Sequence, residues 1–191
     1  MMTAVADAEF IYEGPTAASQ YPLPPLTAGV SPALLSRAIV SGQGLPVYLF
    51  NAGLPYQPSV PHIDVNGAIA NCLSTGHALS PDIVTHLFNA GLQWGERLGR
   101  RFANSYLVIG ECVVAGTTTA QAVLTALGFE VAGMMGSSHL TCNHEQKTVL
   151  VNAGLQGKIA GFTQWTLWDA LAAVGDPKQP IVLGMTIAAS H

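Results

Sequence analysis

Apolar and polar positions form blocks along the chain, and the block at 105–119 (SYLVIGECVVAGTTT) is the most informative. Its apolar run over 106–109 predicts a strand buried on both faces, which stops at a Gly-Glu pair. The following Gly-Thr-Thr-Thr predicts a helix over 117–127, and a second strand is expected over 129–134. A parallel strand-helix-strand unit places its first loop at the carboxyl edge of a sheet, where open α/β folds bind ligands. The pattern therefore favours an α/β fold with chemistry beside the Gly-Glu pair.

The rest of the chain adds helices and one more strand. A short buried strand is expected over 47–50, followed by a long proline-rich loop over 51–76 that suits a lid or substrate wall. The apolar tail at 181–190 has no terminator and reads as an element cut in its middle. Helices are predicted from Ser31-Pro32 to Gly42 or Gly44, from Ser80-Pro81 to about Gly99, from an Asn143 cap to about Asn152, and from Thr163 to Val174. We therefore expect a single domain with a Rossmann-like three-layer parallel sheet and helices on both faces.

Composition excludes several classes of protein. The chain has 191 residues and is 49% hydrophobic, enough for one packed core. Seven Lys and Arg against 11 Asp and Glu give a net charge of -4, which offers nucleic acid no basic footprint. The uncharged stretch 112–129 holds four threonines, a glutamine and two glycines, so we expect a buried helix with its loop and no membrane span. Three cysteines and the absence of a visible export signal predict a cytoplasmic protein.

The helix start at 116–119 is a candidate anion site. Its first backbone amides have no partner within the helix and carry partial positive charge, so they and the hydroxyls can hold a phosphate. A plain threonine cap is the alternative. Lys147 is expected in the first turn of the next helix, where it opposes the helix dipole, and a bound phosphate or Glu111 would offset its charge. Alternatively, Lys147 extends to solvent.

Metal and nucleophile sites are disfavoured. His139, Cys142 and His144 lack a second ligand pair and are interrupted by a helix cap, so no metal is expected. Ser137 and His139 lie two apart in a loop, where side chains rarely face each other, and no G-x-S-x-G elbow exists. A hydrolase is therefore not expected.

Six segments carry a resemblance to a known family: TAVADAEF at Thr3–Phe10, YPLPPLTAGVSP at Tyr21–Pro32, PVYLFNAGLP at Pro46–Pro55, GECVVAGTTTA at Gly110–Ala120, SSHLTCNHEQK at Ser137–Lys147 and VGDP at Val174–Pro177. They resemble the nicotinate-nucleotide:dimethylbenzimidazole phosphoribosyltransferases, especially the archaeal and cyanobacterial branch. The resemblance implies transfer of ribose 5-phosphate from nicotinate mononucleotide to a benzimidazole-like base, in activating the lower ligand of cobalamin. It also implies a homodimer that needs no cofactor. The chain resembles a central portion of that family, without either end.

The resemblance also assigns roles to residues. It implies that Glu111 is catalytic; that Gly116, Thr117, Thr118, Thr119 and Lys147 bind phosphate; and that Asn51, Ser137, Ser138 and His139 bind substrate. Two departures stand out. Ala115-Gly116 replaces the family's Gly-Asn step, and the family's general-base glutamate has no counterpart in this sequence. A non-catalytic nucleotide- or base-binding module is therefore the alternative function. For Glu111 itself, the alternative to catalysis is a structural carboxylate that accepts loop amide bonds.

Overall fold

The structure is a computed structural model that describes residues 3–15, 20–23, 31–137, 141–159 and 165–190. Within these ranges the chain is mixed α/β and mostly helical. The elements are α1 (Thr3–Glu13), α2 (Pro32–Gln43), β1 (Phe50–Asn51), β2 (Ile63–Asp64), the 3-10 turn η1 (Leu73–Thr75), α3 (Pro81–Arg101), α4 (Gly116–Ala126), α5 (His144–Ile159), α6 (Leu167–Val174) and α7 (Lys178–Ala189). None of the helices in these ranges is long and apolar enough to cross a bilayer.

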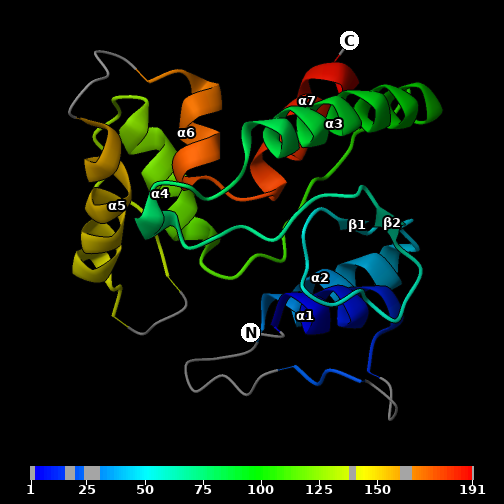
Figure 1. Cartoon of the computed structure of the whole chain (residues 1–191). Coiled ribbons are helices and arrows are strands. Elements are labelled where there is room, and N and C mark those ends of the chain that lie inside the picture. The colour runs from blue at the N-terminus through cyan, green and yellow to red at the C-terminus, as the bar shows by residue number, and fades with distance from the viewer. Residues whose placement is uncertain (1–2, 16–19, 24–30, 138–140, 160–164, 191) are drawn as a thin grey trace.

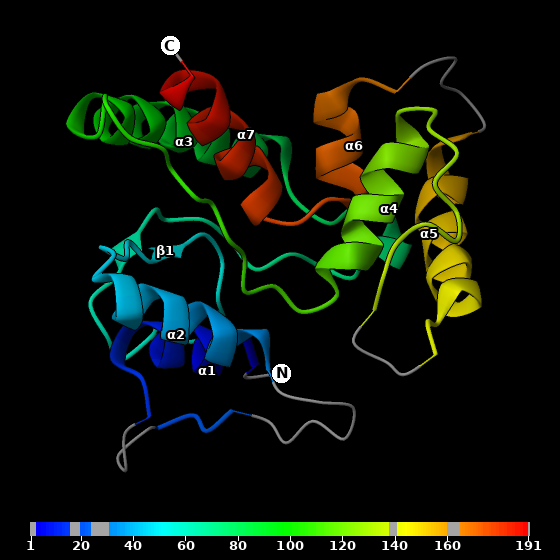
Figure 2. The ribbon, with the colours of Figure 1, turned by 180° about the vertical axis from the view of Figure 1, so that it is seen from behind.

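The helices form three groups around two hydrophobic cores. Helices α4, α5 and α6 enclose the first core together with η1, and α3 packs along α7 to form the second (Figure 1). The second core also contains Phe50 and Ile63 from the two strands. Helices α1 and α2 pack against each other beside the strands. Seen from behind, the link from α6 to α7 passes from one core to the other (Figure 2).

Glycines allow α3 and α7 to pack at backbone distance. A Cβ added at Gly91 or Gly95 would clash with the α7 backbone at Ile181 or Met185, and one added at Gly184 would clash with the α3 backbone. Small residues four apart on one helix face permit this close approach, because only hydrogen atoms separate the two backbones. The α3–α7 pair is therefore held by main-chain contact along a glycine seam, defined here as residues 91, 95 and 184.

The predicted helix starts are confirmed at both serine-proline pairs. The Ser31 side chain accepts a hydrogen bond from the amide of Ala33, and the Ser80 side chain accepts one from Ile83. The helix predicted to end near Asn152 was too short, since α5 continues to Ile159, and the apolar tail, for which no helix was predicted, belongs to α7. The Asn143 side-chain amide donates to the Gln146 side chain at 2.9 Å, and its oxygen accepts no hydrogen bond from the described residues, so the expected Asn143 cap is not formed by that side chain.

The predicted strands are the main correction. Residues 106–109 and 129–134 form no strand, and β1 is only two residues long, shifted toward the end of the strand expected over 47–50. A parallel strand persists only when neighbouring strands satisfy its backbone groups and other elements cover its faces. In the described ranges β1 pairs only with β2, and Phe50 lies opposite Ile63. The strand β2 and the turn η1 both come from the region expected to be a long loop.

Candidate functional site

The candidate site lies at the amino-terminal end of α4. Its N-cap residue Ala115 has φ +62°, in the left-handed region, and none of the side chains that the structure describes caps this end of α4. Gly116 follows and is buried. A Cβ at Gly116 would lie 2.9 Å from Nζ of Lys178 and 3.1 Å from both carboxylate oxygens of Glu111. Glycine at this position therefore makes room for two opposite charges against the helix end.

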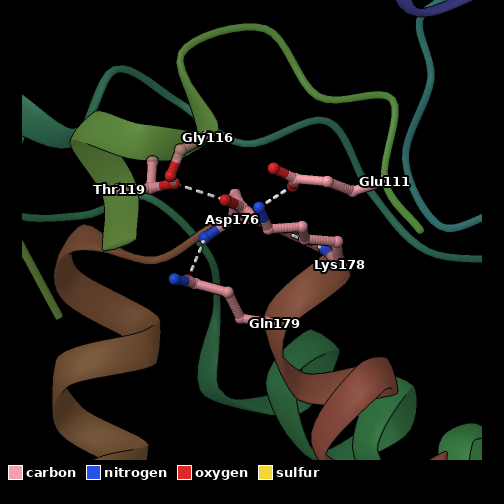
Figure 3. A network of polar contacts seen from close by, with 6 residues as sticks. All are labelled: Glu111, Gly116, Thr119, Asp176, Lys178 and Gln179. Atoms are coloured by element: carbon pink, nitrogen blue, oxygen red, sulfur yellow. Dashed lines mark hydrogen bonds and ion pairs between the residues drawn. The ribbon is translucent and has the colours of Figure 1, made fainter. Parts of the chain in front are cut away.

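Glu111 and Lys178 form an ion pair across this space (Figure 3). The Glu111 side chain comes from the loop before α4 and is 44% exposed, whereas the Lys178 side chain begins α7 and is 21% exposed. Burial lowers the pKa of Lys178, and the adjacent carboxylate acts in the opposite direction because it favours the charged ammonium. The carboxylate occupies a place where the partial positive charge of α4 also favours an anion.

Asp176 supports the pair from the link between α6 and α7. Its side chain is only 4% exposed, and its two oxygens accept hydrogen bonds from the Thr119 hydroxyl and, at 3.1 Å, from the backbone amide of Lys178. The Thr119 hydroxyl also lies 3.0 Å from the carbonyl oxygen of Gly116. The Asp176 amide donates to Oε1 of Gln179 at 2.9 Å (Figure 3). Burial raises the pKa of Asp176, and these hydrogen bonds only partly offset that effect.

Lys147 lies elsewhere. Its side chain is 2% exposed, and its ammonium donates to the carbonyl oxygens of Gly136 and, at 3.3 Å, Met135. These carbonyls belong to the loop before α5. The structure thus pairs Lys178 with Glu111, while Lys147 ties a loop to its helix. Neither a solvent-exposed Lys147 nor an ion pair of Lys147 with Glu111 is observed.

The other expected site residues are spread over several loops. Asn51 is buried at the end of β1, and its side-chain oxygen accepts hydrogen bonds from the amides of Gly53 and Leu54, a turn-forming role. Ser137 is half-buried in the loop before α5, and Ser138 and His139 lie outside the described residues.

The threonines of α4 also differ in their surroundings. Thr117 is exposed at the helix start, whereas Thr118 and Thr119 are buried. Of the three, Thr119 is the one that reaches Asp176. In the described part of the chain no group of three His, Cys, Asp or Glu side chains could hold a metal. Cys142 and His144 do lie together, with Sγ 3.5 Å from Nδ1.

Sequence reasoning missed Asp176 and Lys178. The VGDP segment contains Asp176, but a Gly-Asp-Pro run by itself indicates only a turn. Lys178 follows within two residues, on a helix that the apolar tail did not predict. The start of α7 follows α6 after a short link, and α6 packs against α4, so tertiary packing brings Lys178 to the amino-terminal end of α4. The network joins a carboxylate, an ammonium and the start of a helix, which suits a ligand with an anionic group and a developing cation.

Comparison with known proteins finds cyanobacterial relatives. No protein-family model matches this sequence. The chain is 54% identical to a UPF0284 protein of Nostoc sp. over 199 residues, covering 99% of this chain and 52% of the relative. It is 52% identical to a UPF0284 protein of Synechocystis sp. and 54% identical to one of Gloeothece citriformis, in each case over 51% of the relative. The chain spans about half the length of the curated relatives it matches.

Proposed function

We propose that this protein is phosphoribosyltransferase-like and handles nicotinate mononucleotide, moving its ribose 5-phosphate to the nitrogen of an aromatic base. The observation that carries the proposal is the pairing of Glu111 with Lys178 against Gly116 at the start of α4. This places opposite charges beside helix amides that have no side-chain cap. The Rossmann-like three-layer sheet belongs to the same proposal, as the fold of the full-length relatives.

The nucleotide phosphate binds at the uncapped start of α4. It takes the first helix amides and the ammonium of Lys178, because both favour a doubly charged anion over a single carboxylate. Glu111 then leaves Lys178 and faces the ribose. In this proposal Lys178 binds the nucleotide phosphate, the role that the sequence had indicated for Lys147.

Glu111 stabilises charge during transfer. The bond from the ribose carbon to the nicotinate nitrogen breaks with its electron pair going to nicotinate, and positive charge develops on the ribose. A carboxylate beside it interacts more strongly with this transition state than with the ground state. The azole nitrogen forms the new bond and loses its proton to a base. In the resembled family that base is a glutamate without a counterpart in this sequence.

The second candidate is a nucleotide-binding module without turnover, favoured by that missing glutamate. One experiment tests both the transferase and the binding module. The chain is titrated with nicotinate mononucleotide in a calorimeter, dimethylbenzimidazole is then added, and released nicotinate is measured. The full-length Nostoc relative serves as a parallel sample. Release by the chain supports transfer. Binding without release in the chain, together with release by the relative, supports the binding module, and no binding by either protein refutes both.

Glu111→Gln separates the role of this carboxylate from a structural one. We expect the variant to keep its fold and nucleotide affinity while turnover falls, because the lost interaction strengthens only as charge develops. If Glu111 merely accepts loop amide bonds and pairs with Lys178, the variant instead lowers the melting temperature and leaves turnover per folded molecule unchanged. Turnover is measured in the protein that releases nicotinate, which is either this chain or a full-length relative with a glutamate aligned to Glu111.

A further inference from the structure

The extended segment 106–110 exposes one row of apolar side chains. Tyr106 and Val108 are each 83% exposed, while Leu107 between them packs against the core of the α3–α7 pair. Exposure alternates over Tyr106, Leu107 and Val108 as in a β-strand, whose successive side chains point to opposite faces, and Ile109 is 40% exposed. The segment runs between the α3–α7 pair and β1 on its way to α4 (Figure 2). Its outward face is therefore open at Tyr106 and Val108, and its other face is covered at Leu107.

The backbone of this segment is also unpaired. Among the described residues, no backbone hydrogen bond joins 106–110 to another part of the chain. Within the described ranges, the nearby strands β1 and β2 pair with each other and with no further strand. An extended apolar segment with open backbone groups is an edge that other strands can join, and proteins normally cover or pair such edges. Tyr and Val are among the residues that fit a paired strand best.

The occupant follows from the relatives. About half of each UPF0284 relative has no counterpart in this chain. The sequence carries no charge between Arg101 and Glu111, so the segment suits an apolar neighbour buried in a sheet and not a charged partner.

We infer that residues 106–110 are the docking strand for the unmatched half of the family polypeptide, whether that half is joined to this chain or carried separately. That half supplies a strand that bonds the backbone of 106–110. It also supplies an apolar layer that covers Tyr106 and Val108. In this interface, residues 106–110 and the added strand form part of one sheet, and residues 106–110 lead directly into the loop carrying Glu111.

Hydrogen exchange tests the pairing in proteins as they exist. In this chain alone we expect the amides of 106–110 to exchange within about 10-fold of the unprotected rate, as in exposed loops. In the full-length Nostoc relative, the aligned amides should exchange at least about 100-fold more slowly. The amides of α3 are the internal control, expected to be slow in both. Equally fast exchange of the segment in both proteins would overturn the inference.

Two neighbouring substitutions test whether the outward face is uncovered. Val108→Asp should leave the melting temperature of the chain within about 1 °C, because surface changes have small effects. Leu107→Asp, the matched control, should lower it clearly, since Leu107 packs on the core. Equal losses would show that Val108 is already covered and would overturn the proposal. Analytical ultracentrifugation adds a third outcome: a dimer of this chain abolished by Val108→Asp would assign the face to a second copy instead.

Discussion

The ion pair between Glu111 and Lys178 joins the loop before α4 to the first residue of α7. The two residues belong to parts of the chain that pack into different hydrophobic cores. Gly116 lies under both charges, so the helix start, the carboxylate and the ammonium form one unit. The cation beside Glu111 is therefore Lys178, from the start of α7, and not Lys147.

Lys178→Gln should weaken the binding of nicotinate mononucleotide by about 1–3 kcal/mol through the loss of charge-assisted bonds. Lys147→Gln should instead lower the melting temperature, because its buried ammonium holds two loop carbonyls. Calorimetric titration and thermal melting of both variants provide the comparison. Loss of affinity in Lys147→Gln at an unchanged melting temperature would restore Lys147 as the phosphate ligand.

Asp176→Asn should stabilise the protein more at pH 8 than at pH 4. Burial raises the pKa of Asp176 above its usual 3.8, so the folded chain holds this proton more tightly than the unfolded chain. The stability that this group contributes is full below pH 3.8 and falls as the pH rises through the folded pKa. The asparagine side chain of Asp176→Asn does not ionise, so it avoids this loss of stability at high pH. Its NH2 group can also donate to the Thr119 hydroxyl.

Thermal melts at the two pH values measure this effect. Asp176→Ala is the control, expected to lose about 1–3 kcal/mol at both pH values because the Thr119 hydroxyl and the Lys178 amide lose their acceptor. An Asp176→Asn variant that is less stable than the wild type at pH 8 would show that the ionised carboxylate is the favoured form.

Gly95→Leu should destabilise the protein by about 3 kcal/mol or more, because a side chain there meets the α7 backbone with no space to yield. Gly42→Ala is the matched control in a helix, where an added Cβ meets nothing within 4 Å. It should stabilise by about 0.4–1 kcal/mol by restricting the unfolded chain. Urea unfolding measures both, and a tolerated Gly95→Leu would contradict the close packing of α3 on α7.

Ala115→Gly should raise the free energy of unfolding by up to about 1 kcal/mol, because a left-handed conformation costs a residue with a Cβ about 1–2 kcal/mol. Ala120→Gly, inside α4, should lower it by about 0.5–1 kcal/mol. Opposite signs in urea unfolding would verify the strained turn at the candidate site. A loss of stability in both variants would mean that Ala115 is not strained.

The cysteines should react with iodoacetamide in a fixed order. Burial, with a contribution from Asp7, raises the pKa of Cys112 to about 11, so roughly one thiol in a thousand is ionised at pH 8. The Ser74 hydroxyl lowers the pKa of the exposed Cys72. Mass spectrometry should find Cys72 modified first and Cys112 last, with Cys72→Ser as the control. Early modification of Cys112 would contradict its burial.

The helix starts could be predicted from local signals in the sequence, whereas the strands could not. Ser31 and Ser80 cap the helices that their proline neighbours indicated, because capping depends on a few adjacent residues. The apolar run 106–109 has the composition of a buried strand, but a strand exists only with neighbours, and those are not within the described chain. The composition of residues 106–109 therefore indicated that they can form a strand, but it did not show that they form none in this structure.

The site was predicted in part for the same reason. The loop carrying Glu111 and the helix start at Gly116 are close in sequence and were placed together correctly. The cation beside Glu111 is Lys178 and not Lys147, although only Lys147 carried a local signal, because tertiary packing brings Lys178 to this carboxylate. Asp176 is conspicuous only once its burial is known.

The site has a mechanical consequence that follows from the glycine seam. Main-chain contact leaves α7 little freedom to slide or turn on α3, so the first residue of α7 moves only when the whole helix pair moves. The start of α4, by contrast, belongs to a helix that packs into the other core, which α3 joins only through its first turns. Between them lies the short link that carries Asp176. The ion pair between Glu111 and Lys178 therefore connects two differently packed parts of the molecule, and any change in the angle between the two cores would change the distance between these two charges.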